Sequence, residues 1–299
     1  MKKQLPTKKV KIFTDSPSDI TVQMAEQRGI SLMPATVYLD GKEIVDAVDC
    51  SKEQYIELLK NSTGIPTTSY YPMVNIQEDF EKYYNEGYTH FIIVPICSPA
   101  SGLYNCVASV REEFAEKHPD LRIDLIDSMT FSYCYGRYVY QAAQMALDGV
   151  DGDEILTYLK DKLARSEAFA GMMELKYAKR SGRISGAVAF AGELLGLKPI
   201  MHIMDSQVAR YGKVKGEKAV LPELIECVRK NAVDIEAQEL CILYGDFTEG
   251  EVNEAESAIA EALNPKSIIR LRLGSAITSH AGPKTIAIAF EGEKKDYYS

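Results

Sequence analysis

The first half of the chain alternates apolar, β-rich segments with segments of helical periodicity. Strands that alternate with helices in this way lie parallel in one sheet, and the helices cover its two faces. We therefore predict a three-layer α/β/α domain with a mostly parallel sheet. The paired strand and helix segments are residues 10–13 and 20–27, 91–96 and 103–116, and 121–126 and 135–147.

A β-hairpin interrupts this alternation. Residues 32–39 predict a strand, and Asp40-Gly41 directly after it suits a type I′ turn. The hairpin marks either an edge of the sheet or an excursion from it.

The second half of the chain predicts a different architecture. Segment 148–152, rich in glycine and aspartate, ends the pattern, and a helical segment at 154–165 leads out of the first half. We place two domains at 1–165 and 166–299, with a ligand site at their interface. Adjacent strands mixed with helices favour a two-layer α+β domain with a mixed sheet. Its strands are predicted at 169–173, 200–204, 207–214, 240–244, 268–273 and 285–290, and its helices at 175–179, 188–195, 221–229 and 251–263.

Composition argues against several classes of function. The 299 residues include 43 acidic and 34 basic ones, and a net charge of −9 argues against nucleic acid as a partner, because phosphate binding needs clustered positive charge. The longest apolar runs, such as 91–97, are far shorter than the roughly 20 residues that span a bilayer. We expect a cytoplasmic protein without stable membrane insertion. The four histidines and six cysteines lack ligand-like spacing, which predicts reduced thiols, no metal and no cofactor.

Five short polar motifs stand where predicted strands or helices end. They combine hydroxyl-bearing residues and glycines with an arginine and a histidine. Ligands of open α/β sheets bind in the crevice at the strand ends, so we expect one anion site built from both halves of the chain. The motifs are Thr14 to Asp19, Thr67-Thr68-Ser69, Ser101-Gly102-Leu103-Tyr104, Ser181-Gly182-Arg183-Ile184-Ser185 and Ser279-His280-Ala281-Gly282-Pro283.

Each motif also has a purely structural interpretation. Ser101 precedes a helix whose first N–H groups attract an anion, but a serine there equally caps the helix. Thr67-Thr68-Ser69 predicts either an extended loop of hydroxyl donors or a turn. Arg183 follows a helix and either offers a planar fork to an anion or pairs with the helix dipole. His280, in a predicted turn, is either structural or donates to a carboxylate. Asp15 is expected to orient a loop, because it would repel an anion.

Catalytic motifs are weak in this sequence. It lacks a dinucleotide-binding G-x-G-x-x-G, a phosphate loop ending in G-K-S/T and a G-x-S-x-G nucleophile elbow. A triad of Ser101, His280 and Asp127 is obtained only by choosing among abundant residue types. Two alternatives to a binding protein remain. One is an acyl- or phosphoryl-group hydrolase or transferase with Ser101 or Cys97 as nucleophile, and the other is a regulatory or scaffold protein without a ligand.

In order and spacing, the five motifs resemble those of the DegV family of bacterial fatty-acid-binding proteins. Segments 126–128, 194–200 and 213–216 add to the resemblance, which extends from Lys11 to Phe290. It implies a two-domain carrier, not an enzyme, that buries one long-chain fatty acid, roughly C14 to C20. It also implies a partner, a fatty acid kinase, which phosphorylates the carboxylate that the carrier presents.

The resemblance also implies roles for single residues. Thr68 and Ser101 match the family's threonine and serine that hold the carboxylate. Arg183 and His280 match its arginine and histidine motifs, and we expect them to lie behind the carboxylate-binding groups or to face the kinase. The same position is expected for Thr67, Ser69 and Gly102.

The sequence departs from the family pattern beside these residues. Two tyrosines after Thr68 are expected to narrow the pocket or change its rim, and Lys284 adds a charge for the head group or for a partner. We expect the departures to affect chain-length preference and kinase contact more than the carboxylate site. They are Tyr70, Tyr71, Leu103, Ser181 and Lys284.

Overall fold

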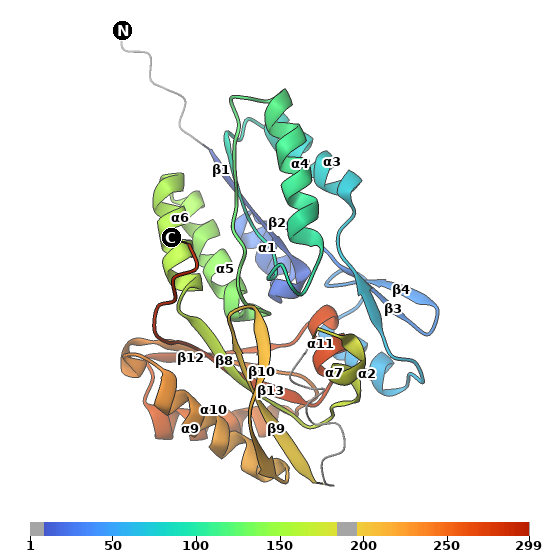
Figure 1. Cartoon of the computed structure of the whole chain (residues 1–299), viewed down its shortest axis with the longest axis vertical. Helices are drawn as coiled ribbons and strands as arrows, with labels where there is room; N and C mark the ends of the chain where they lie inside the picture. Colours follow the sequence, from blue (N-terminus) through green and yellow to red (C-terminus); the bar gives the residue numbers. More distant parts are fainter. Residues whose placement is uncertain (1–8, 184–195, 299) are drawn as a thin grey trace.

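A computed structural model of the chain describes residues 9–183 and 196–298. The predicted helix at 188–195 lies outside these ranges. Within them, a parallel sheet (sheet A) forms from the first half and a mixed sheet (sheet C) from the second. The predicted fold class is thereby confirmed, and Figure 1 shows the two parts one above the other. The domain boundary at 165/166 stays a prediction.

Sheet A has the strand order β2-β1-β6-β7, and every pair in it is parallel. Phe13 and Phe91 pack on the face covered by α3 and α4, whereas Ile12 and Ile92 pack on the face covered by α1, α5 and α6. Three layers result. The elements are β1 (Val10–Asp15), β2 (Ser31–Met33), β6 (His90–Val94), β7 (Arg122–Leu125), α1 (Val22–Arg28), α3 (Met73–Asn85), α4 (Leu103–Lys117), α5 (Tyr133–Leu147) and α6 (Gly152–Leu163).

The predicted hairpin is an excursion into a small sheet of its own, sheet B. The predicted strand 32–39 is divided between β2 and β3 (Thr36–Leu39), and β3 pairs with β4 (Lys42–Val45). Asp40 and Gly41 both have positive φ, as a type I′ turn requires. On its other side β3 pairs with β5 (Thr67–Ser69), so the predicted loop at 67–69 is in fact a short strand.

Sheet C has the order β10-β9-β8-β13-β11-β12, in which only β11 and β12 pair in parallel. Helices α9 and α10 cover one face of the sheet with a separate apolar cluster. The other face looks toward the first half of the chain. The elements are β8 (Ser166–Met172), β9 (Leu197–Met204), β10 (Gln207–Lys215), β11 (Glu239–Tyr244), β12 (Ser267–Arg272), β13 (Thr285–Glu291), α9 (Val220–Asn231) and α10 (Glu249–Leu263).

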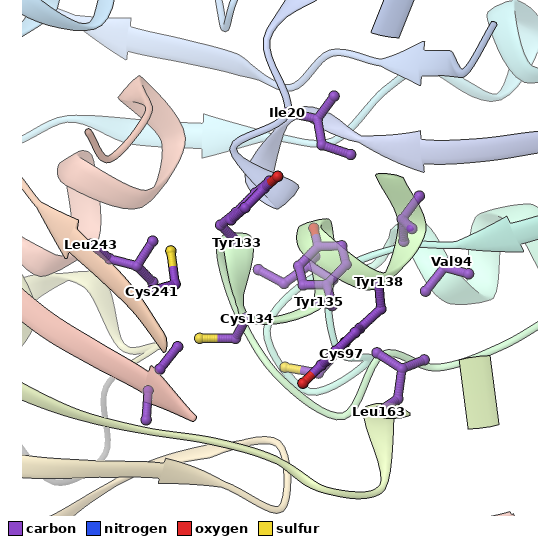
Figure 2. Close-up of a cluster of buried hydrophobic side chains, with 14 of the residues drawn as sticks. Ile20, Val94, Cys97, Tyr133, Cys134, Tyr135, Tyr138, Leu163, Cys241 and Leu243 are labelled. Carbon is purple, nitrogen blue, oxygen red and sulfur yellow. The ribbon is translucent and has the colours of Figure 1, made fainter. Parts of the chain in front are cut away.

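One continuous hydrophobic core joins the two halves. Figure 2 shows Cys134 and Tyr135 of α5 lying between β11, with Cys241 and Leu243, and Val94 of β6. Five of the six cysteines, all except Cys50, are buried, and all six thiols are free. None of the helices in the described ranges is long and apolar enough to cross a membrane.

Three further helices lie between sheet A and sheet C (Figure 1). Helix α2 (Lys52–Lys60) begins with a capping box of Ser51 and Gln54. Helix α7 (Lys176–Ser181) and helix α11 (Ser275–Ala281) pack against each other, and Figure 1 shows them beside α2 between the two large sheets. We predicted His280 to lie in a turn shaped by Gly282 and Pro283; His280 instead lies in helix α11, which ends at Ala281, and the chain bends at Pro283 and Lys284.

Candidate functional site

A cavity of about 320 Å³ lies between the two halves of the chain. Its apolar wall comes from both halves, and the inner face of sheet C contributes Ala170 and Met172 of β8, Leu243 of β11 and Ala287 of β13. The wall also carries most of the polar residues singled out in the sequence. These are Thr68, Ser69, Ser101, Gly102, Arg183 and His280.

Thr68 and His280 contact each other on the cavity wall. The Thr68 hydroxyl lies 2.9 Å from His280 Nε2, although the two residues are 212 positions apart. Pairing of β5 with β3 holds Thr68, and α11 carries His280. The other ring nitrogen, Nδ1, is buried without a hydrogen-bond partner.

The His280 ring is neutral at pH 7. Burial lowers its pKa to about 4, and the nearby positive charge of Arg183 lowers it further in the same direction. A neutral imidazole has one donor and one acceptor nitrogen. His280 therefore acts on Thr68 through a hydrogen bond rather than through a charge.

Ser101 lies at the beginning of α4, where the parallel strand β6 leads into a helix. Its hydroxyl accepts the N–H of Leu103 at 3.2 Å, and Gly102 is the residue that caps the helix. A hydroxyl that accepts with its oxygen retains its own hydrogen to donate. Ser101 thus stabilises the first turn and can still offer a donor to the cavity.

Arg183 is exposed at the end of α7. Its guanidinium donates to the Ser181 carbonyl oxygen at 2.9 Å, and its backbone N–H donates to the Ser181 hydroxyl at 3.2 Å. The guanidinium bond folds the side chain back onto the helix end and leaves a cation on the cavity wall.

Asp15 also lines the cavity, at the carboxyl end of β1. Its carboxylate accepts the N–H of Ile96 at 3.1 Å and the Tyr135 hydroxyl at 2.6 Å, so it orients the segment after β6. Burial raises the pKa of Asp15 to about 7 despite these donors. A carboxyl group that is partly protonated at neutral pH repels a neighbouring anion less than an ordinary aspartate does.

Other expected residues lie away from the cavity. Thr67 is exposed and points outward from β5. The Lys284 ammonium lies 4.7 Å from the centre of the Phe247 ring, and Lys284 does not line the cavity. The first α-helix, α1, is capped by Thr21, which accepts the N–H of Met24.

Sequence reasoning missed most of the apolar wall. Ala170, Leu243 and Ala287 alternate with residues that face α9 and α10, yet both sets are apolar, so no alternation distinguishes the cavity face from the packed face. It also did not predict that two aspartates, one of them in the first polar motif, hold α11. Asp19 accepts the N–H of Gly274 at 2.7 Å, and Asp46 accepts the N–H of Ser275 at 3.0 Å.

Solved structures show the same fold. A structure described as fatty acid binding of a DegV family protein from Thermus thermophilus superposes with a TM-score of 0.84 at 25% identity, covering 95% of this chain and 99% of that one. A stearic acid-binding protein from Eubacterium ventriosum has a TM-score of 0.83 at 22% identity, covering 94% and 97%.

Sequence comparison gives the family. A DegV domain-containing protein of Clostridium perfringens is 32% identical over 291 residues, which are 97% of this chain and 99% of the relative. One from Caldanaerobacter subterraneus is 31% identical over 283 residues, covering 95% and 99%. The family model described as an uncharacterised protein of the DegV family matches residues 9–293. The chain therefore belongs to the DegV family.

Proposed function

We propose that this protein is a cytoplasmic carrier that buries the chain of one long-chain fatty acid and holds its carboxylate with Thr68 and Ser101. One observation carries the proposal. The cavity between the two halves combines an apolar wall from sheet C with hydroxyl groups from β5 and the start of α4. The fatty acid binding ascribed to the Thermus thermophilus relative supports the same ligand class.

Burial of the acyl chain would supply most of the affinity. Each methylene removed from water contributes about 0.8 kcal/mol, so a chain of some fifteen methylenes gains roughly 12 kcal/mol before the costs of binding. A hydrogen bond to the head group adds about 1 kcal/mol net. The polar groups therefore need only satisfy the carboxylate that the tail brings into the site.

The contact between Thr68 and His280 favours a carboxylate as the head group. If His280 Nε2 carries the proton, it donates to the Thr68 oxygen, and the Thr68 hydroxyl hydrogen is free to donate to the ligand. In the opposite tautomer Nε2 carries no proton and accepts the Thr68 hydroxyl hydrogen. Only the lone pairs of the Thr68 oxygen would then face the carboxylate. We propose the first arrangement, with His280 as a positioning residue for Thr68.

The contacts favour a carrier over a hydrolase. Asp127 accepts the N–H groups of Ser98 and Met129, and His280 Nε2 contacts Thr68, so the triad with Ser101 is not assembled. Burial raises the pKa of the Cys97 thiol well above its ordinary value. Because the thiolate is the reactive form, Cys97 is a poor nucleophile at neutral pH.

Fatty acid binding by delipidated protein tests the carboxylate site. We expect saturable binding of C14 to C20 acids, and in Thr68→Ala with Ser101→Ala an affinity about 30-fold lower, because two hydrogen bonds are worth roughly 2 kcal/mol. Thr67→Ala, which changes a threonine on the outer side of the same strand, is the matched control and should bind normally. Wild-type protein that binds no such acid would favour a scaffold, and a double variant that binds like wild type would place the head group elsewhere.

We further propose that the carrier presents the carboxylate to a separate fatty acid kinase, with Arg183 facing that partner. Arg183 is exposed and sits on the wall beside His280, where an approaching enzyme would meet it. With a bacterial fatty acid kinase and ATP, we expect ligand-loaded protein to yield acyl phosphate. Arg183→Ala should slow that reaction at least 10-fold while fatty acid affinity changes less than 3-fold. Equal loss of both would mean that Arg183 serves the ligand instead.

A further inference from the structure

The cavity contains a buried carboxyl group beside the segment that leads to Ser101. Asp15 ends β1, is 2% exposed and lines the cavity. Its carboxylate accepts the N–H of Ile96, and the chain then turns back on itself, because the Ala100 N–H donates to the Cys97 carbonyl oxygen at 3.0 Å. That turn leads directly to Ser101. Asp15 therefore lies at the polar end of the cavity, near one of the two hydroxyls proposed to hold the ligand.

Among residues 9–183 and 196–298, the groups that donate to the Asp15 carboxylate are neutral. The Tyr135 hydroxyl reaches Oδ1 at 2.6 Å, and the Ile96 N–H reaches Oδ1 at 3.1 Å and Oδ2 at 3.2 Å. Oδ2 thus has only a shared donor there and is the oxygen that can carry a proton. Burial favours the protonated form and raises the pKa of this carboxyl group to about 7 despite both donors.

A fatty acid would bring a second carboxylate into the same cavity. Two like charges at one site favour protonation of one of the two groups. The hydroxyls of Thr68 and Ser101 would donate to the ligand, and the cation of Arg183 lies on the same cavity wall. All three favour the ionised form of the ligand. Asp15, which is buried and has neutral donors, is therefore the group that takes the proton.

We propose that Asp15 binds one proton when the site takes a fatty acid, so that the ligand stays an ionised carboxylate beside a neutral Asp15. This inference rests on the proposed function and adds a proton from solvent as a second ligand of the same site. No bond within the fatty acid changes. The ionised carboxylate is also the form that a fatty acid kinase needs, because a carboxylate oxygen must attack the phosphoryl group.

Other titratable and charged groups surround Asp15. They are Tyr135 and Cys134 on α5, Cys97 after β6, Asp19 after β1, Asp46 after β4, and His280 and Arg183 on the cavity wall. Burial raises the pKa values of the tyrosine and of both thiols and lowers that of His280 to about 4, so these groups keep their charge near neutral pH. Burial raises the pKa of Asp19 to about 6, and a variant of Asp19 is therefore needed as a control.

The affinities for an acid and for the matching alcohol, measured from pH 6.5 to pH 8.5, test the proposal. The probes are myristic acid, which is ionised in solution throughout this range, and 1-tetradecanol, which has no charge. We expect wild-type affinity for the acid to fall about 10-fold over the range, and affinity for the alcohol to change less than about 2-fold. Asp15→Asn, which cannot take up the proton, should bind the acid equally well at both ends of the range.

Two further measurements do not depend on the folding of Asp15→Asn. Calorimetry of wild-type protein in buffers of different ionisation enthalpy counts protons, and we expect an uptake of about half a proton to one proton per acid bound at pH 7.5. Tyr135→Phe removes a donor to the ionised form of Asp15 and should move the fall in affinity to higher pH. Asp19→Asn changes a neighbouring buried carboxyl group that does not line the cavity, and it should keep the wild-type profile.

The outcomes separate this inference from the proposed function. If wild-type protein binds neither probe, the proposed fatty acid site is wrong. If it binds the acid without proton uptake, or with the same pH profile as Asp15→Asn, the fatty acid site stands and the role of Asp15 is overturned. An equal fall in affinity for acid and alcohol would also overturn it, because the effect would then not depend on the charge of the ligand.

Discussion

Ala287→Leu is expected to weaken binding of a C18 fatty acid about 60-fold while C12 binding changes less than 3-fold. Ala287 lies on β13, is 4% exposed and faces the cavity. Leucine adds three carbons there, and if they displace three methylenes of the ligand, about 2.4 kcal/mol is lost. Affinities for a series of saturated acids from C10 to C18 measure the effect.

The register partner of Ala287 provides an independent check. Ala170 on β8 lies directly opposite and lines the same cavity, so Ala170→Leu should produce a similar loss that grows with chain length. The added side chains enter empty space, and we expect the thermal midpoint of both variants to stay near that of wild type. Equal loss for C12 and C18 in a folded variant would show that the end of the acyl chain does not lie beside Ala287 and Ala170.

The strands were easier to predict from sequence than the helices that carry the site. Helix α11 shows why, because its segment Ser275–Ala281 contains threonine, two serines and histidine, which form helices poorly by themselves. Its first N–H groups are instead bound by Asp19 and Asp46, more than 200 residues earlier in the chain. No local pattern contains that information.

The candidate site combines local and long-range determinants in the same way. The sequence predicted that Ser101 lies between the end of a strand and the start of a helix, and the structure has it between β6 and α4. Thr68 looked like a loop residue because β5 is short and half-exposed, and it becomes a strand only through pairing with β3. Its contact with His280 could not follow from periodicity; the two residues entered one hypothesis through the positions of their motifs at the ends of predicted elements and through the resemblance to the DegV family.

Two buried aspartates make folding stability depend on pH. Burial raises the pKa of Asp15 to about 7 and that of Asp19 to about 6, from an ordinary 3.8, although Lys52, the Ser132 hydroxyl and the Gly274 N–H all oppose the shift at Asp19. At these two carboxyl groups the folded protein therefore holds more protons than the unfolded chain between about pH 4 and pH 7, whereas at His280, whose pKa is lowered from 6.5 to about 4, it holds fewer. Asp15 and Asp19 should therefore lower the stability as pH rises through that window, whereas His280 should raise it between about pH 4 and pH 6.5.

We expect ionisation of Asp19 to lower the free energy of unfolding by about 3 kcal/mol in full, with most of that loss between pH 4 and pH 7. Asp19→Asn mimics the protonated side chain, since its oxygen can accept from Gly274 and its amide can donate to the Ser132 oxygen. It should be more stable than wild type at pH 8 and similar near pH 4, as measured by urea unfolding. Asp234→Asn, the same change at an exposed position, is the control. An Asp19→Asn profile parallel to wild type would show that Asp19 is hydrated, and hence that the contact between α11 and the first half opens in solution.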